Sequence, residues 1–386
     1  MIFNSIFKRI VISATAFLWL LCLATPVYSQ EFEQQSEEAL TGQVVEVLEN
    51  EYRTVEGIDE KQLYQLLKIR ILKGSIKGSV VEIENGNYAQ GRVYEYNKGD
   101  RLIISYYENQ EGKPVFLITN IVRTPSLLWL TVIAVILIIW IGRIKGLTSL
   151  VGMIFSFAVI MLFIIPGILA GKNPVVTSII GSVAIVPVTF YLSHGFTRKT
   201  SVAVISTLIS LACTIIFATF FVNAAKLTGL GSDDAMFLLT IKDAAIDLKG
   251  LVLAGIIIGT LGILDDITIA QVGIVFRLKE LSPGLRADEL YFKAIEHGRD
   301  HIASMVNTLV LAYTGASLPI LLLFADSSRG FDEVINMEMI AEEVVRTLVG
   351  SIGLVLAIPI STFAAVFACQ VSKSDGVVTP EKLSVP

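Results

Sequence analysis

The amino-acid sequence predicts an α-helical polytopic membrane bundle of about seven transmembrane helices, preceded by a small all-β domain outside the cytoplasm. Hydrophobic residues make up 53% of the 386 residues. Charged residues make up only 17%, whereas soluble chains average roughly 25%. The charges are concentrated before residue 124, and long apolar runs occupy most of the remainder. The chain therefore contains one region suited to water and another suited to lipid.

The first 29 residues have the layout of a secretory signal peptide. Lys8 and Arg9 form a basic start, residues 10–24 are apolar, and small residues precede Gln30. The apolar run is shorter than the ~20 residues that a membrane-spanning helix needs. We therefore predict a signal peptide at residues 1–29 that is cleaved after export, with an uncleaved signal anchor as the alternative.

Residues 30–124 are predicted to form an extracytoplasmic β-rich domain. Runs of β-forming residues separated by Gly- and Asn-containing turns lie at 42–48, 67–71, 80–83, 101–106 and 115–118. Short strands in this arrangement predict a small antiparallel barrel of the oligonucleotide/oligosaccharide-binding (OB) or SH3-like type. The domain holds no pattern of catalytic or metal-binding residues, so we expect a structural or protein-contact role.

Residues 125–370 are predicted to form the transmembrane helical domain, and residues 371–386 a cytoplasmic tail. Apolar runs long enough to cross a hydrocarbon core of ~30 Å as helices lie at 126–142, 148–169, 174–193, 200–222, 249–265, 302–325 and 345–369. Their continuous hydrophobicity excludes the alternating pattern of a membrane β-barrel. The amphipathic segment 232–248 is expected at the external interface or as a re-entrant element.

The basic residues predict an orientation for this bundle. With the β domain exported, Lys and Arg are more frequent in the loops on the cytoplasmic side than in the external loops, as the positive-inside rule requires. About seven crossings then place the N-terminal domain outside and the C-terminus inside. The expected location is the plasma membrane of a bacterium, with the lipid bilayer as the surroundings of the bundle.

Two adjacent carboxylates, Asp265 and Asp266, follow a glycine-rich apolar stretch. Because a charge near the bilayer interior is costly, such a residue usually faces the bundle interior, pairs with another charge or marks an ion path. We predict the pair to carry a proton or a cation, with a helix-end charge pair at the cytoplasmic interface as the alternative. Gly255, Gly259 and Gly262 precede the pair and are predicted to be helix-packing residues, because small residues let helices approach closely in membranes.

A second polar segment surrounds the start of the apolar run 302–325. Arg299 and Asp300 precede this run, and Arg299 is expected to pair with one of the two aspartates. Asn307 and Thr308 lie within the run, where an amide needs a partner on another helix or a permeating solute. These four residues are candidates for the same ion path, although for Asn307 we favour a structural hydrogen bond between helices.

Several classes of function are excluded by what the sequence lacks. It contains no zinc-binding His-Glu-x-x-His, no Gly-x-Ser-x-Gly elbow and no Walker loop. We therefore expect no enzyme activity, no catalytic residue, no metal site and no cofactor. Cys22, Cys213 and Cys369 show no spacing typical of a disulfide framework or a thiolate metal site. No basic stripe with interleaved aromatic residues is present, so nucleic acid is not an expected partner.

Three stretches of the sequence resemble the YibE/F-like family of bacterial multispanning membrane proteins. They are residues 251–279, the string 298–319 that begins Gly-Arg-Asp and ends Ser-Leu-Pro, and residues 341–360. The resemblance covers roughly residues 125–370 well and the N-terminal domain more loosely. It implies a small N-terminal domain followed by a helical bundle, in a family described only in terms of transport or efflux. The doubled acid at Asp265 and Asp266 departs from the single acidic residue expected at this turn, which leaves open which of the two matters.

Two functions of different kinds fit these observations. The leading hypothesis is a secondary transporter or permease for a small solute or ion. The rival is a non-transporting membrane scaffold or envelope assembly factor, which would hold an envelope protein through the exported domain. A homo-oligomer is compatible with either. The transport hypothesis predicts that Asp265, Asp266, Arg299 and Asn307 converge on one water-accessible cavity.

Overall fold

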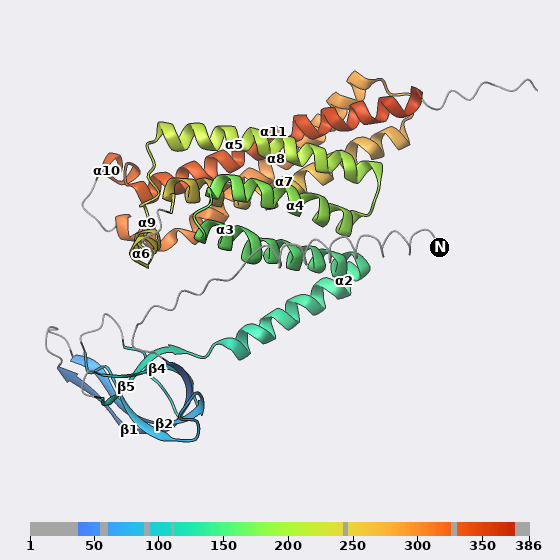
Figure 1. Ribbon diagram of the computed structural model, residues 1–386. Coiled ribbons are helices and arrows are strands. Elements are labelled where there is room, and N and C mark those ends of the chain that lie inside the picture. The colour runs from blue at the N-terminus through green and yellow to red at the C-terminus, as the bar shows by residue number, and fades with distance from the viewer. Residues whose placement is uncertain are drawn as a thin grey trace, which may run out of the picture. The chain divides into compact units, whose positions relative to one another are not determined.

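The computed structural model describes residues 38–54, 61–88, 93–109, 112–241, 246–325 and 330–374. The chain divides into two compact units, with the boundary between Leu137 and Ile138 (Figure 1). The predicted signal peptide at residues 1–29 lies outside the described residues, as does most of the predicted tail at 371–386.

The first unit is built on one antiparallel sheet that forms a half-barrel (Figure 1). Its five strands are β1 (Glu38–Thr54), β2 (Lys61–Lys73), β3 (Val80–Asn85), β4 (Arg101–Glu108) and β5 (Pro114–Ile121). They are hydrogen-bonded in the order β3-β2-β1-β4-β5. Each strand contains one of the five predicted runs, so the prediction of a β-rich N-terminal region with five strands is confirmed.

Alternating side chains explain why this sheet curls around a core. Leu67, Ile69 and Ile71 of β2 point to one face and are almost fully buried, as are Leu40 and Val44 of β1. The pairing of β1 with β2 shifts register at three places, and such bulges bend a strand and increase its twist. The bent strand β1 can therefore pair with β2 on one side and with β4 on the other.

A buried glutamine attaches an irregular segment to this sheet. The Gln65 side chain donates a hydrogen bond to the Tyr96 carbonyl oxygen at 3.0 Å and accepts one from the Tyr96 backbone N–H at 2.9 Å. Gln65 is fully buried, so these bonds satisfy polar groups that have no access to water. They hold the chain against β2 at Tyr96, where the backbone forms no strand.

The second unit is helical. The helices are α2 (Thr124–Val159), which contains the unit boundary, the π-helix η1 (Ile160–Ile164), α3 (Ile165–Leu169), α4 (Pro174–His194), α5 (Arg198–Ala224), α6 (Asp233–Ile241), α7 (Leu248–Leu281), α8 (Ala287–Ala316), α9 (Leu318–Ala325), α10 (Phe331–Ile335) and α11 (Glu338–Ser374). In the described part of the chain, five helical segments are long and apolar enough to cross a membrane: Thr124–Leu169, Pro174–His194, Arg198–Ala224, Leu248–Leu281 and Glu338–Gln370. The chain is therefore a multi-pass membrane protein.

The number of segments differs from the seven predicted runs for two physical reasons. The segment Thr124–Leu169 contains two of the runs, divided at Arg143, whose φ of 50° and ψ of −130° are not helical. Beyond this break, a Cβ atom on Gly146 would collide with the Ile138 carbonyl oxygen, so the chain bends sharply there. The run 302–325 is also divided, because α8 ends at Ala316 and α9 begins at Leu318.

Polar contacts and close approaches hold the helices of this unit together. The Thr207 and Thr268 hydroxyls lie 2.6 Å apart and join α5 to α7. The Gln271 side-chain nitrogen donates to the Ala294 carbonyl oxygen and to the Thr362 hydroxyl, both at 2.8 Å, and so connects α7 with α8 and α11. Without water in the hydrocarbon region, such bonds between helices and tight small-residue contacts stabilise a bundle.

The glycines at the tightest helix contacts are not the ones that the sequence pattern indicates. A Cβ atom on Gly298 would lie 2.5 Å from Ile358, and one on Gly353 would collide with Thr214. At Gly255 and Gly262, by contrast, an added Cβ would meet no described atom within 4 Å. The spacing of glycines on α7 predicts close helix packing, but of the three glycines only Gly259 would bring an added Cβ within 4 Å of another helix, at 3.4 Å from the Tyr313 hydroxyl of α8.

Candidate functional site

A polar cavity of about 730 Å³ lies among the second part of α2, α4 and α7. Its lining residues are Lys145, Ser149, Gly152, Met153, Ser156, Thr189, Phe190, Ser193, His194, Gly262, Asp265, Asp266 and Ile269. Both predicted carrier aspartates belong to this set. Three helices therefore bring charged and hydroxyl-bearing side chains together, several of which are exposed within this chain.

Helical periodicity explains how each element contributes to this cavity. Residues three, four or seven positions apart share one face of a helix. On α7, Gly262, Asp265, Asp266 and Ile269 follow this spacing. Lining residues on α2 and α4 recur at similar intervals. At Gly152 of α2 an added Cβ would lie 3.7 Å from the Thr189 backbone of α4, so the two helices are close here.

The two aspartates differ in their surroundings. Asp265 is partly buried, and in the described part of the chain its buried Oδ1 atom has no hydrogen-bond partner. Asp266 is exposed within this chain. A buried acceptor without a partner is costly, so Asp265 requires a proton, a water molecule or a cation to complete its interactions.

Hydroxyl groups add further acceptor atoms to the cavity. The Ser156 hydroxyl donates its hydrogen bond to the Gly152 carbonyl oxygen at 3.1 Å, within its own helix. The Thr189 hydroxyl likewise donates to the Ile185 carbonyl oxygen at 3.0 Å. Because each hydroxyl has only one hydrogen to donate, both groups have only lone pairs left for a bound ligand. Together with carboxylate oxygens, such atoms are suited to a hard cation or a proton-bearing group.

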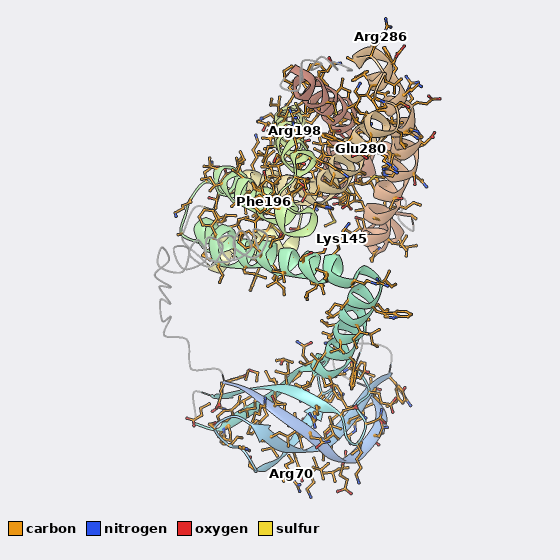
Figure 2. The ribbon with its side chains drawn as sticks, turned by 90° about the vertical axis from the view of Figure 1, so that its right-hand side faces the viewer. Arg70, Lys145, Phe196, Arg198, Glu280 and Arg286 are labelled. Carbon is orange, nitrogen blue, oxygen red and sulfur yellow. The ribbon has the colours of Figure 1, made fainter. Side chains whose placement is uncertain are left out.

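Two basic residues that the sequence reasoning did not select as site residues also line the cavity. Lys145 lies just after the break in α2 (Figure 2), and His194 is the last residue of α4. His194 is within electrostatic range of Lys199, Lys145 and Asp266. In the sequence, Lys145 was informative only for membrane orientation, and a single histidine at the end of an apolar run carries little signal.

The other predicted ion-path residues are not brought to this cavity. Arg299, Asp300, Asn307 and Thr308 are all exposed on α8 and are not among the lining residues. The Thr308 hydroxyl donates to the Ser304 carbonyl oxygen of its own helix at 2.9 Å. Among the ion pairs of the described residues, Arg299 has none with either aspartate. The expected convergence is therefore limited to the two aspartates.

Helix rotation accounts for this separation. Gly298 of α8 is buried against Gln271 of α7 and Ile358 of α11. The next two residues are rotated away from that contact, because an α-helix has 3.6 residues per turn.

The three predicted packing glycines of α7 also have different surroundings. Gly262 lines the cavity. At Gly259 an added Cβ atom would lie 3.4 Å from the Tyr313 hydroxyl oxygen, and at Gly255 it would face open space.

Comparison with protein families identifies both parts of the chain. The family model described as YibE/F-like protein matches residues 130–371. The model described as YibE/F family N-terminal domain matches residues 35–121. Comparison with curated proteins and with solved structures gives no match. Because the first model covers more than half of the chain, this membrane protein belongs to the YibE/F-like family.

Proposed function

We propose that the protein is a secondary transporter that moves a small cation or a proton-coupled solute through the cavity formed by α2, α4 and α7. The observation that carries this proposal is the buried Oδ1 atom of Asp265, which has no partner among the described residues and belongs to a side chain that lines the cavity. Asp266 and hydroxyl groups supply further oxygen atoms there, beside the basic residues Lys145 and His194. A carboxylate in this setting binds a cation or a proton reversibly, because the bound species replaces the interactions that water would otherwise supply.

Buried hydroxyls on α4 extend the polar lining beyond the cavity. The Ser178 and Ser182 hydroxyls are buried and have no hydrogen-bond partner among the described residues. Ser182 lies seven residues before Thr189 and Ser178 lies eleven before it, so all three share one face of α4. A line of acceptors along one helix is the kind of feature that an ion or proton path requires.

The proposed topology has seven crossings in the plasma membrane of a bacterium. Dividing Thr124–Leu169 at Arg143 gives two crossings. The other four apolar segments give one crossing each, and the second half of α8 together with α9 gives the seventh. We propose that the β domain is exported behind a cleaved signal peptide and that the C-terminus is cytoplasmic.

For the β domain we propose an OB-type barrel. The strand order supports this fold, because β3 and β5, the two edge strands of the sheet, lie near each other.

Uptake into proteoliposomes tests the transport proposal. The purified full-length chain would be reconstituted and supplied with radiolabelled sodium, radiolabelled rubidium, or a pH gradient read by an entrapped pH-sensitive dye. We expect uptake of at least one probe above that of protein-free liposomes. The double variant Asp265→Asn/Asp266→Asn is expected to lose about tenfold or more of the initial rate, the effect of about 1.4 kcal/mol on the barrier. Wild-type rates in that variant would contradict the role of the carboxylates.

The alternative function, a non-transporting scaffold, is favoured by one observation. Arg299, Asp300, Asn307 and Thr308 lie on an exposed face outside the cavity, where they are free to contact another protein. Crosslinking followed by affinity purification separates the two functions. A stoichiometric envelope partner captured through the β domain, together with unchanged uptake in the double aspartate variant, would support the scaffold.

A further inference from the structure

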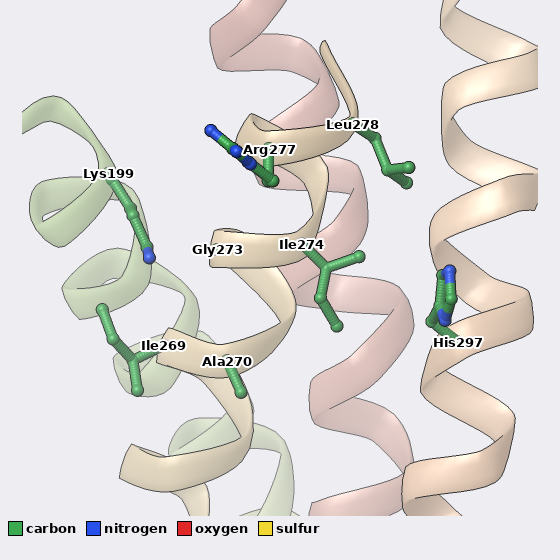
Figure 3. Close-up of a pocket in the computed structure, with 8 residues that line it drawn as sticks. All are labelled: Lys199, Ile269, Ala270, Gly273, Ile274, Arg277, Leu278 and His297. Atoms are coloured by element: carbon green, nitrogen blue, oxygen red, sulfur yellow. The ribbon is translucent and has the colours of Figure 1, made fainter. Parts of the chain in front are cut away.

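A second cavity lies on a different part of α7 and has a different chemical character. This basic groove, of about 420 Å³, is lined by Lys199, Ile269, Ala270, Gly273, Ile274, Arg277, Leu278 and His297. Figure 3 shows that Lys199 comes from α5 and His297 from α8, on either side of α7. The basic groove shares only Ile269 with the lining of the carboxylate cavity. None of its lining residues is acidic.

Lys199 of α5 approaches α7 at a glycine. A Cβ atom on Gly273 would lie 2.6 Å from the Lys199 Nζ atom and 3.0 Å from its Cε atom, so the ammonium lies directly against the α7 backbone at this position. No ion pair or hydrogen bond of the Lys199 ammonium is found among the described residues, and the group is only partly exposed. An ammonium held in this position without a counter-charge is available to an anionic ligand.

Arg277 can be recruited to the same ligand. Its guanidinium pairs with Glu280 at 3.2 Å, but both side chains are about two-thirds exposed. Exposed pairs of this kind contribute little to stability, so an anion can replace Glu280 at low cost. The planar guanidinium binds phosphate oxygens in a bidentate manner, whereas Lys199 acts as a point charge.

The remainder of the basic groove is apolar. Ile269, Ala270, Ile274 and Leu278 line it along α7. Lys199 belongs to the first turn of α5, and Arg277 lies near the C-terminal end of α7. The groove is thus located where two membrane-crossing segments end, which is the level of lipid headgroups. A soluble anion would use only the charged rim, whereas a phospholipid would also cover the apolar residues.

We propose that the basic groove binds a phosphate-bearing anion, supplied by an anionic phospholipid whose headgroup contacts Lys199, Arg277 and His297. One acyl chain lies along the apolar residues of α7. This inference does not depend on the transport proposal, because the groove and the carboxylate cavity use different charged residues. The lipid class that fits is a phospholipid with net negative charge, as opposed to a zwitterionic one of the same chain length.

Native mass spectrometry of the full-length chain in detergent tests this inference. The probes are dioleoylphosphatidylglycerol, dioleoylphosphatidylcholine and inorganic phosphate. We expect the wild type to retain the anionic lipid about tenfold more than the zwitterionic one. The groove variant Lys199→Gln/Arg277→Gln should lose that preference, since each basic residue near the membrane surface contributes about a fivefold factor.

The matched control is Arg198→Gln/Lys293→Gln, which removes the same charge from residues outside the groove. This control should retain the lipid preference of the wild type, and circular dichroism should show that all variants are folded. Equal binding of the anionic lipid by the groove variant and the wild type would overturn the inference. Displacement of the lipid by millimolar inorganic phosphate, with equal binding of both lipids, would also overturn it and assign the groove to a soluble phosphate.

Discussion

Asp265 and Asp266 are adjacent in the chain, yet they have different surroundings. Neighbouring residues of an α-helix point in directions about 100° apart. Asp265 is turned into the bundle and its Oδ1 atom is buried without a partner among the described residues, whereas Asp266 is exposed. The doubled acid left open which residue matters, and this difference in burial leads us to expect the larger role for Asp265.

Single amide substitutions should separate the two aspartates by their effect on stability. Asp265→Asn replaces a carboxylate whose buried Oδ1 atom lacks a partner among the described residues by a neutral group of the same shape. We expect it to raise the free energy of unfolding by about 1 kcal/mol, because the uncompensated burial of a polar group is relieved. Asp266→Asn should change it by less than about 0.5 kcal/mol, as is usual at an exposed site. Thermal unfolding of the two purified variants measures the difference. Equal midpoints would argue against a special position for Asp265.

Gly262 offers a way to fill the carboxylate cavity without disturbing the fold. An added Cβ at this position meets no described atom within 4 Å, and the residue lines the cavity. Gly262→Leu should therefore block ligand access and reduce uptake by about tenfold or more. The matched control is Gly255→Leu on the same helix, where an added Cβ is also free but faces away from the cavity. If both variants transport at the same rate, the cavity is not the path.

At the scale of helices and strands, the break in α2 is the clearest departure from regular geometry. Arg143 has φ 50° and ψ −130°, a conformation that glycine adopts readily and other residues avoid. Lys145, two residues later, lines the carboxylate cavity. The break therefore ends the first helical part of α2 and positions Lys145, the first α2 residue that lines the carboxylate cavity.

Arg143→Gly should stabilise the protein by about 1 kcal/mol, because glycine removes the strain at this position. Arg143→Gln is the control, since it removes the same charge but keeps a side chain in the strained conformation. Comparison of the unfolding midpoints of the two purified variants measures the effect of strain alone. A lower midpoint for the glycine variant would show that Arg143 is held by side-chain contacts that outweigh the strain.

Sequence patterns predicted those structural features that depend on a single helix or strand. Runs of β-forming residues separated by turn residues located the strands, because each strand presents one apolar face to the core of the half-barrel. Hydrophobic runs located the membrane segments, because every helix in lipid must be apolar along its length. The break at Arg143 and the division of the run 302–325 involve special backbone angles and helix ends, for which a run of apolar residues carries no signal.

The candidate site was only partly predictable for a related reason. The cost of a carboxylate in a membrane segment identified Asp265 and Asp266 without any structure. Lys145 and His194 join them through the packing of α2 and α4 against α7, which no local pattern specifies. Arg299 and Asn307 were expected at the cavity, but the rotation of α8 leaves them exposed.

For the whole molecule, the orientation of the chain in the membrane can be tested separately from its activity. We expect a protease added to spheroplasts to cleave an epitope tag inserted at the start of the β domain and to spare a tag at the C-terminus. This outcome follows from an odd number of crossings and from the excess of basic residues on the cytoplasmic side. Protection of both tags or cleavage of both would require an even number of crossings.

The most direct test of the central claim is the initial rate of cation or proton uptake by reconstituted protein, compared across two double variants in which charged residues are replaced by neutral ones. Asp265→Asn/Asp266→Asn alters the carboxylate cavity, whereas Arg299→Gln/Asp300→Asn alters charged residues that the structure places outside it. We predict that the first variant loses about tenfold or more of the wild-type rate and that the second retains it. Equal rates in the first variant and the wild type, or a loss confined to the second, would contradict the assignment of the path to α2, α4 and α7.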